Sequence, residues 1–140
     1  MDAMEIVRPA LVLAGWTLVM FGWMGLTRIP AMSAAKIDPQ QARDTVRLRE
    51  LLPEEVQRVA NNYNHLFEQP TLFYAVVLML VSTNLVDDLH VACAWTFTGL
   101  RIVHSCVQAT IDVVPIRFGL FVLSWVALGT MIVRALIAAF

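Results

Sequence analysis

The segment from Arg58 to Glu68 holds side chains suited to binding a charged molecule, and it stands directly before a wholly apolar run, TLFYAVVLMLV. A helix turns by about 100° per residue. Counted from Arg58, this turn predicts that four polar side chains share an arc of about 100°, namely Asn61, Asn64, His65 and Glu68. Asn62 and Tyr63 are predicted to point elsewhere. The polar groups therefore form a stripe of donors with one carboxylate.

A second polar stripe is predicted in the segment RIVHSCVQATID, which begins at Arg101. The same count places its polar side chains within an arc of about 100°; they are Arg101, His104, Ser105, Gln108 and Asp112. The opposite face is apolar. Ionisable groups inside a membrane cost ~2.5–3.5 kcal/mol each, so they survive by facing protein or water. We therefore expect the two stripes to face each other around one polar pocket.

The residue types in this pocket favour the binding of a small anion. Arg101, His104 and Arg117 can each donate hydrogen bonds to a carboxylate. Glu68 is the expected charge partner of Arg101, and Arg117 is expected to close the mouth of the pocket. Two other interpretations of the stripes stay open: a purely structural polar network between helices, and a path for protons or ions.

The composition is that of a membrane protein. Of 140 residues, 59% are hydrophobic and only 15% are charged, whereas about a quarter of a soluble domain is charged. A net charge of −1 without a basic face argues against nucleic acid as a partner. No metal site is expected, because His65, His90 and His104 do not have the spacing of metal ligands.

Four apolar segments are predicted to position the two stripes. Each holds about 20 residues, the length that crosses a ~30 Å hydrocarbon layer as a helix. The sequence predicts helices over 8–29, 54–86, 90–112 and 116–140. The second is expected to start in water near Pro53 and to continue into the membrane as one long helix. A kink at Pro70 would widen the polar pocket; the alternative is that Pro70 only bends the helix to fit its neighbours. The predicted fold class for residues 1–140 is therefore all-α, an integral membrane four-helix bundle in a single domain.

Charged residues between the apolar segments predict the orientation in the membrane. The loop over 31–57 holds Lys36, Arg43, Arg47 and Arg49, whereas the connection at 87–88 holds only acids. Because basic loops stay on the cytoplasmic side, both termini are predicted to lie outside the cytoplasm. The short connections favour a bacterial inner membrane, with an organelle membrane as the alternative. The first apolar segment is too long for a signal peptide and follows acidic residues, so it is expected to be a retained span.

Two motifs in these segments resemble those of a known family. The third segment and the turn after it hold RIVHS and PIR, which supply Arg101, His104, Ser105, Pro115 and Arg117. The second segment holds FEQPTLFY, from Phe67 to Tyr74. With these motifs and four spans, the chain resembles the MAPEG family, the membrane-associated proteins in eicosanoid and glutathione metabolism. The resemblance covers essentially the whole chain.

The resemblance implies a homotrimer of four-helix bundles surrounded by membrane lipids. It also implies glutathione as the cofactor, bound between adjacent subunits near the cytoplasmic side, and a lipophilic small molecule as the substrate. Arg117 matches the arginine that would hold the thiolate, which makes it the implied catalytic residue. The implied glutathione-binding residues are Asn61, Asn64, His65, Glu68, Arg101, His104 and Gln108.

The chain departs from the family pattern at several positions. Asn64 and His65 occupy the arginine and asparagine positions of an R-N-x-x-E motif. Gln108 stands in place of a tyrosine, and Phe118 in place of a polar residue. Two functions therefore follow. The first is a glutathione-dependent membrane transferase or peroxidase that acts on a lipophilic electrophile. The alternative is a non-catalytic lipid-binding or scaffold protein whose polar stripes are structural.

Overall fold

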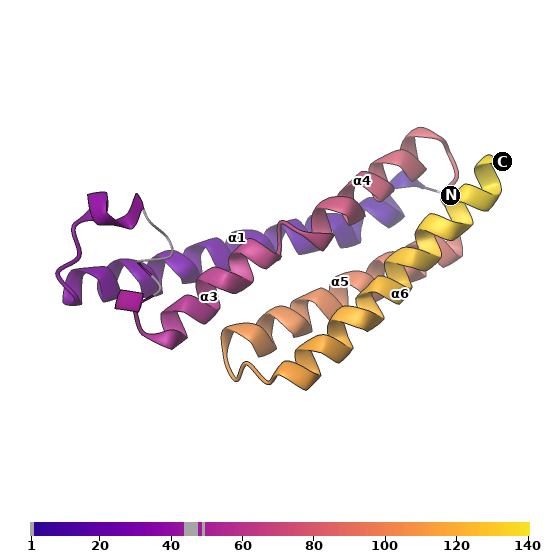
Figure 1. The fold of residues 1–140 in the computed structure, drawn as a ribbon. Coiled ribbons are helices and arrows are strands. Elements are labelled where there is room, and N and C mark those ends of the chain that lie inside the picture. Colours follow the sequence, from indigo (N-terminus) through magenta and orange to yellow (C-terminus); the bar gives the residue numbers. More distant parts are fainter. Residues whose placement is uncertain (1, 44–47, 49) are drawn as a thin grey trace.

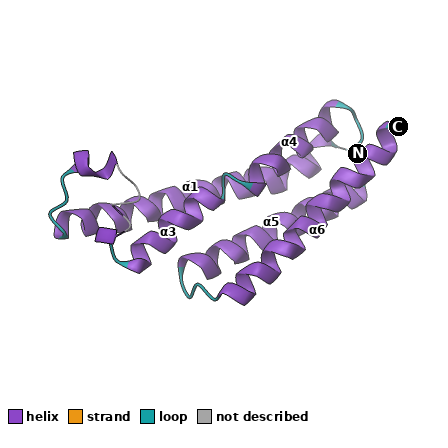
Figure 2. Ribbon diagram, viewed as in Figure 1, coloured by secondary structure: helices purple, strands orange, loops and turns teal. Residues whose placement is uncertain are grey.

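The computed structural model describes residues 2–43, 48 and 50–140, and within them the chain is helical and has no strand (Figure 2). Its elements are α1 (Ala3–Ala34), the 3₁₀ helix η1 (Pro39–Arg43), α3 (Glu54–His65), α4 (Gln69–Ser82), α5 (Asp88–Ala109) and α6 (Val114–Ala139). Arg47 and Arg49, which entered the prediction of orientation, lie outside the described residues. The predicted all-α fold class is confirmed.

The helices form two long groups (Figure 1). In one, α1 packs along α3 and α4, which follow each other end to end; in the other, α5 packs along α6. The two groups are joined by contacts of α1 and α3 with α5 and of α4 with α6, so all the helices form one bundle. Both chain ends and the turn between α4 and α5 lie at one end of the bundle, and the connection between α1 and α3 lies at the other.

Three helical stretches in the described part of the chain are long and apolar enough to cross a membrane: α1, the stretch Glu54–Ser82 that contains α3 and α4, and α6. A fourth span was predicted over 90–112. α5 in this region has 22 residues, about 33 Å at 1.5 Å per residue, but it is less apolar. Its buried face holds Arg101, His104, Ser105 and Gln108, so α5 is the helix whose polar groups the rest of the bundle must shield.

The second predicted helix is interrupted. One uninterrupted helix over 54–86 was expected, and this is wrong: α3 ends at His65 and α4 begins at Gln69, with a short loop between them (Figure 2). Pro70 has no amide hydrogen, and its ring conflicts with the carbonyl four residues earlier. The amides of Phe67 and Glu68 bond instead to carbonyls three residues back, at 3.0 and 3.3 Å.

Proline alone does not explain this break, because α1 continues through Pro9 and Pro30. Side chains also hold the break open. The carbonyl of His65 accepts a hydrogen bond from Nη2 of Arg101 at 3.3 Å, and Nδ1 of His65 lies 2.5 Å from the Glu68 carboxylate. The carbonyl of His65 and the carboxylate of Glu68 thus each have a side-chain partner at the break. These two contacts stabilise the interrupted helix.

The turn between α5 and α6 depends on Asp112, which has a left-handed backbone conformation with φ of 51°. A non-glycine residue rarely adopts a positive φ, although aspartate tolerates it better than most. The amide of Asp112 donates to the carbonyl of Val107 at 2.8 Å, which closes the end of α5. The chain then reverses into α6, and the carboxylate of Asp112 is left beside the first turn of that helix.

The end of the bundle opposite the chain termini extends beyond the α5–α6 turn (Figure 1). α1 has 32 residues, about 48 Å at 1.5 Å per residue, which exceeds the ~30 Å of a hydrocarbon layer. Its last turns pack with a small separate core that contains Ile37, Leu48 and Leu52. This extension supports the first residues of α3, from which the polar stripe begins.

Candidate functional site

A buried hydrogen-bond network joins α1, α3 and α5 at the middle of the polar stripes. The hydroxyl of Ser105 accepts hydrogen bonds from Nε1 of Trp16 at 2.9 Å and from the side-chain amide of Asn62. Asn62 and Ser105 are both fully buried. Asn62 was predicted to point away from Asn61 and Asn64, and it does; the expectation that Asn61 and Asn64 face the stripe of α5 is wrong, because Asn62 is the residue that meets Ser105. The buried face of α3 is set by Val59, Asn62 and Leu66, which pack between α1 and α5.

Arg101 is fully buried, and its side chain is the largest of the fully buried side chains among the described residues. Its Nη2 donates to the carbonyl of His65, while Nε and Nη1 have no hydrogen-bond partner among the described residues. A buried donor without an acceptor costs about 1–3 kcal/mol, and more when it is charged. Arg101 is thus a cation whose environment favours an additional acceptor.

The predicted ion pair between Glu68 and Arg101 is wrong. The carboxylate of Glu68 pairs with Nδ1 of His65 at 2.5 Å, and its side chain is 65% exposed. The reason is the helix break: Glu68 has φ of −89° and ψ of −98°, outside the helical range, so the helical count no longer fixes its direction. Glu68 lies next to the predicted pocket but does not neutralise the buried guanidinium directly.

A cavity of 220 Å³ opens where α3, α5 and α6 meet. It is lined by His65, His104, Val114, Arg117, Phe118 and Phe121. The rings of His65 and His104 lie 5.2 Å apart, centre to centre, and Phe121 approaches His65 at 5.8 Å. Three predicted site residues therefore share one cavity, and a fourth, Arg101, contacts the backbone of His65 behind its wall.

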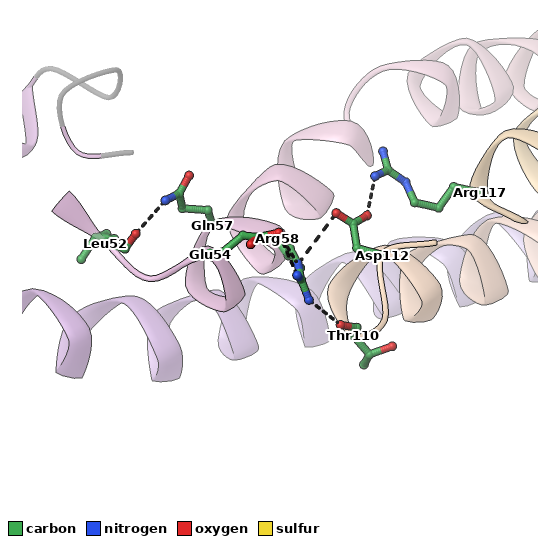
Figure 3. Close-up of polar contacts among 7 residues, drawn as sticks. All are labelled: Leu52, Glu54, Gln57, Arg58, Thr110, Asp112 and Arg117. Atoms are coloured by element: carbon green, nitrogen blue, oxygen red, sulfur yellow. Dashed lines mark hydrogen bonds and ion pairs between the residues drawn. The ribbon is translucent and has the colours of Figure 1, made fainter. Parts of the chain in front are cut away.

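A chain of charges borders this cavity on the side of the α5–α6 turn (Figure 3). Arg117 donates from Nη1 to the carboxylate of Asp112, whose other oxygen lies 3.8 Å from Nε of Arg58. Arg58 also donates to the carbonyl of Thr110 at 3.0 Å and pairs with Glu54 at 2.8 Å. This chain joins the start of α3 to the first turn of α6.

Other predicted site residues lie outside the cavity. Asn61 and Asn64 line a smaller hollow of 90 Å³ on another face of α3, together with Arg28 of α1. Gln108 is buried within α5, and its Oε1 has no partner among the described residues. Arg28 was not predicted, because a single cation at the end of an apolar segment gives no signal of its own in the sequence.

The arrangement has the chemistry of an anion site with an apolar side. Two histidines and two arginines lie within or directly behind one cavity, whereas the acids nearby are already paired, Asp112 with Arg117 and Glu68 with His65. Guanidinium groups bind carboxylates and stabilise thiolates. Phe118 and Phe121 give the opposite wall a surface that suits a lipophilic molecule.

The chain was compared with models of known protein families, with curated proteins and with solved structures. The model of the MAPEG family matches residues 6–137, which include every helix described above except the outermost residues of α1 and α6. No curated protein and no solved structure matches the chain significantly. Since the match covers nearly the whole chain, the protein belongs to the MAPEG family.

Proposed function

We propose that the protein is a glutathione-dependent membrane transferase or peroxidase that acts on a lipophilic electrophile. The observation that carries this proposal is the grouping of His65, His104 and Arg117 around one cavity, with the unpaired donors of buried Arg101 behind it. Membership of the MAPEG family supports the choice of glutathione among small anions.

The side chains around the cavity fit the groups that glutathione carries. Its two carboxylates call for hydrogen-bond donors, of which His104 lies in the cavity wall and Arg101 directly behind it, and its amine calls for an acceptor, a role that we assign to Glu68. When bound, glutathione supplies a thiol whose thiolate form is the reactive nucleophile. Arg117 lines the cavity and keeps its positive charge beside that position, so it favours loss of the thiol proton. His65 orients Glu68 through their 2.5 Å contact.

The apolar wall of the cavity supports a lipophilic second substrate. Val114 and Phe118 are each 65% exposed and lie beside Arg117 on the first turns of α6. A molecule dissolved in the membrane could approach along this surface and reach the cationic group without entering water. Phe118 thus takes a role in binding the electrophile in place of a polar contribution to the thiolate.

We further propose that the protein assembles as a homotrimer in a bacterial inner membrane, with its termini outside the cytoplasm. The placement of both chain ends at one end of the bundle supports an even number of crossings (Figure 1). Asn61, Asn64 and Gln108 lie outside the cavity within one chain, and they would serve glutathione only where an adjacent subunit extends the site. Membrane lipids would cover the many exposed apolar side chains.

One observation favours the alternative of a non-catalytic lipid-binding or scaffold protein. Part of the predicted stripe is engaged in contacts inside the bundle, since the hydroxyl oxygen of Ser105 already accepts hydrogen bonds from Trp16 and Asn62. If Arg101 and His104 were equally structural, the stripes would only hold helices together. The two functions differ in whether glutathione stabilises the folded protein.

The deciding experiment is a thermal-unfolding titration of the purified full-length protein with glutathione, paired with an assay of conjugation to chlorodinitrobenzene. A specific site should raise Tm with glutathione concentration, by an amount that corresponds to about 2.7 kcal/mol at 100 times Kd. Ophthalmic acid, which has a methyl group in place of the thiol, should raise Tm similarly without supporting turnover. Absence of any shift at millimolar glutathione, together with absence of turnover, would overturn the proposal in favour of the alternative.

A further inference from the structure

Asp112 is held in an uncommon conformation at the border of the cavity. Its φ of 51° lies in the left-handed region, where an asparagine or glycine would be easier to accommodate and most other residues are strained. Its amide is fixed by the 2.8 Å hydrogen bond to Val107. The turn fixes the position of the backbone, and contacts with two arginines place the carboxylate. An observed conformation of this kind is a reason to ask what the side chain does.

The two oxygens of this carboxylate are divided between two cations. One accepts from Nη1 of Arg117, and the other lies 3.8 Å from Nε of Arg58 (Figure 3). Arg58 is in turn fixed by its hydrogen bonds to the carbonyl of Thr110 and to Glu54. The side chain of Asp112 is only 24% exposed, so its contacts are shielded more than those of a surface pair.

This contact limits what the Arg117 side chain can do. A free arginine has many rotamers and must lose that freedom to act on a bound group. Here Nη1 is committed to Asp112, while Nε is buried and has no partner among the described residues. The contact ties one end of the guanidinium to Asp112, and the side chain of Arg117 lines the cavity from that anchored position.

We propose that Asp112 is a positioning residue for Arg117 in the glutathione reaction, and that Arg58 supports it from α3. This inference rests on the proposed function, and it assigns the site a residue that does not touch the thiol itself. The task of Asp112 is to hold the guanidinium of Arg117 toward the cavity before any ligand arrives. Arg58 makes the longer contact, so its share of the effect is smaller.

Positioning can be separated from a simple effect of charge because the two have opposite signs. A carboxylate beside Arg117 reduces the positive potential in the cavity. If Asp112 acted by charge alone, Asp112→Asn would leave a more positive cavity, lower the pKa of the glutathione thiol and raise activity. If Asp112 positions Arg117, the same substitution releases the guanidinium and activity falls, because small misplacements cost roughly 100-fold in well-oriented reactions.

The first test measures kcat, KM and the pH profile of conjugation for the full-length protein in detergent. We expect Asp112→Asn to lower kcat by roughly 10- to 100-fold with little change in KM, and Asp112→Glu to recover part of it. Asp88→Asn removes an exposed acid at the other end of α5 and should leave kcat unchanged. In an Arg117→Lys background, Asp112→Asn should have a much smaller effect. Equal effects in both backgrounds, or a gain in activity, would overturn the proposal.

A second measurement does not depend on turnover. Phenylglyoxal modifies free guanidinium groups, and mass spectrometry can follow the modification at Arg117 itself. We expect Asp112→Asn to accelerate the modification of Arg117, Arg58→Gln to accelerate it less, and Asp88→Asn to leave it unchanged. An unchanged rate in Asp112→Asn would overturn the positioning role. If the wild-type protein shows no turnover while the labelling follows this order, the proposed function fails and the contact between Asp112 and Arg117 stands.

Discussion

The two ends of the α5–α6 pair share one feature, an ion pair between an aspartate and an arginine, but differ in the charges around it. At each end an aspartate in a turn pairs with an arginine of α6: Asp112 with Arg117 at one end, and Asp87 with Arg134 at the other. Asp87 also caps α5 by accepting from the amide of His90 at 2.9 Å. The cavity beside Asp87 and Arg134 measures 530 Å³, larger than the 220 Å³ beside Arg117.

The difference between the ends lies in the charges that remain after pairing. Near Asp87 and Arg134 the described ion pairs balance each other, and exposed Asp88 adds a further acid. Near Arg117 the buried guanidinium of Arg101 stays without a paired carboxylate, and Arg58 contributes a second cation to Asp112. The same acid–arginine pair thus occurs at both ends, and the buried, incompletely paired guanidinium of Arg101 is what makes one end a candidate site. Cavity size alone would have selected the other end.

The largest expected effect comes from removing one arginine from each end. Arg117→Ala should lower kcat for glutathione conjugation by roughly 100-fold, the usual cost of losing one preorganised donor in an active site. Arg134→Ala removes the matching residue of the other pair and should leave kcat unchanged. Steady-state kinetics on both variants, with size-exclusion chromatography to check assembly, measures the contrast. Similar kcat values for the two variants would remove the distinction between the ends.

The next effect concerns the buried cation behind the cavity. Arg101→Met keeps a long side chain but removes the charge, so glutathione affinity should fall by at least about 10-fold, the value of one charged hydrogen bond. Stability should stay the same or rise, because replacing an incompletely paired buried charge by an apolar side chain is often neutral or stabilising. Calorimetric titration and thermal unfolding measure the two quantities. A large loss of stability with unchanged affinity would instead indicate that Arg101 is structural.

A smaller effect is expected at the break between α3 and α4. Pro70→Ala restores an amide hydrogen and favours one continuous helix, which would change the direction of Glu68 relative to the cavity. We expect helix content to rise in far-ultraviolet circular dichroism and kcat/KM to fall several-fold. Pro30→Ala is the control, since α1 already continues through that proline. If Pro70→Ala changes neither quantity, the side-chain contacts of His65 and Glu68 hold the break without help from the proline.

The smallest effect should appear at the opposite end, as a dependence of stability on pH. Burial raises the pKa of Asp87, but hydrogen bonds from the His90 amide and Arg134 outweigh it, so the pKa lies below its ordinary value of 3.8. A lowered pKa in the folded state contributes stability above pH 3.8, and this contribution is lost as the pH falls through the lower folded value. The loss of Tm on acidification through this range should therefore be smaller in Asp87→Asn than in the wild type. Parallel pH profiles would show that this pair contributes nothing.

Residue spacing predicted the features that are set within a single helix, such as its length and which side chains share a face. Apolar length predicted the all-α bundle, and helical periodicity predicted that His65 and His104 would meet. Periodicity failed at Glu68, because its direction depends on a break that contacts from another helix stabilise. It failed at Asn61 and Asn64, because the angles on α3 do not reveal which of its faces α1 and α5 cover. The pairing of Asp112 with Arg117 depends on a left-handed turn, which has no period in the sequence.

The most direct test of whether the anion site lies at the end that holds Arg117 is a calorimetric titration of glutathione into the full-length protein in lipid nanodiscs. It is carried out on the wild type, Arg101→Gln and Arg134→Gln. A saturable site should appear in the wild type, should weaken strongly in Arg101→Gln, and should be unaffected in Arg134→Gln. Absence of saturable binding in the wild type, or equal weakening in both variants, would contradict the assignment of the anion site to the end that holds Arg117.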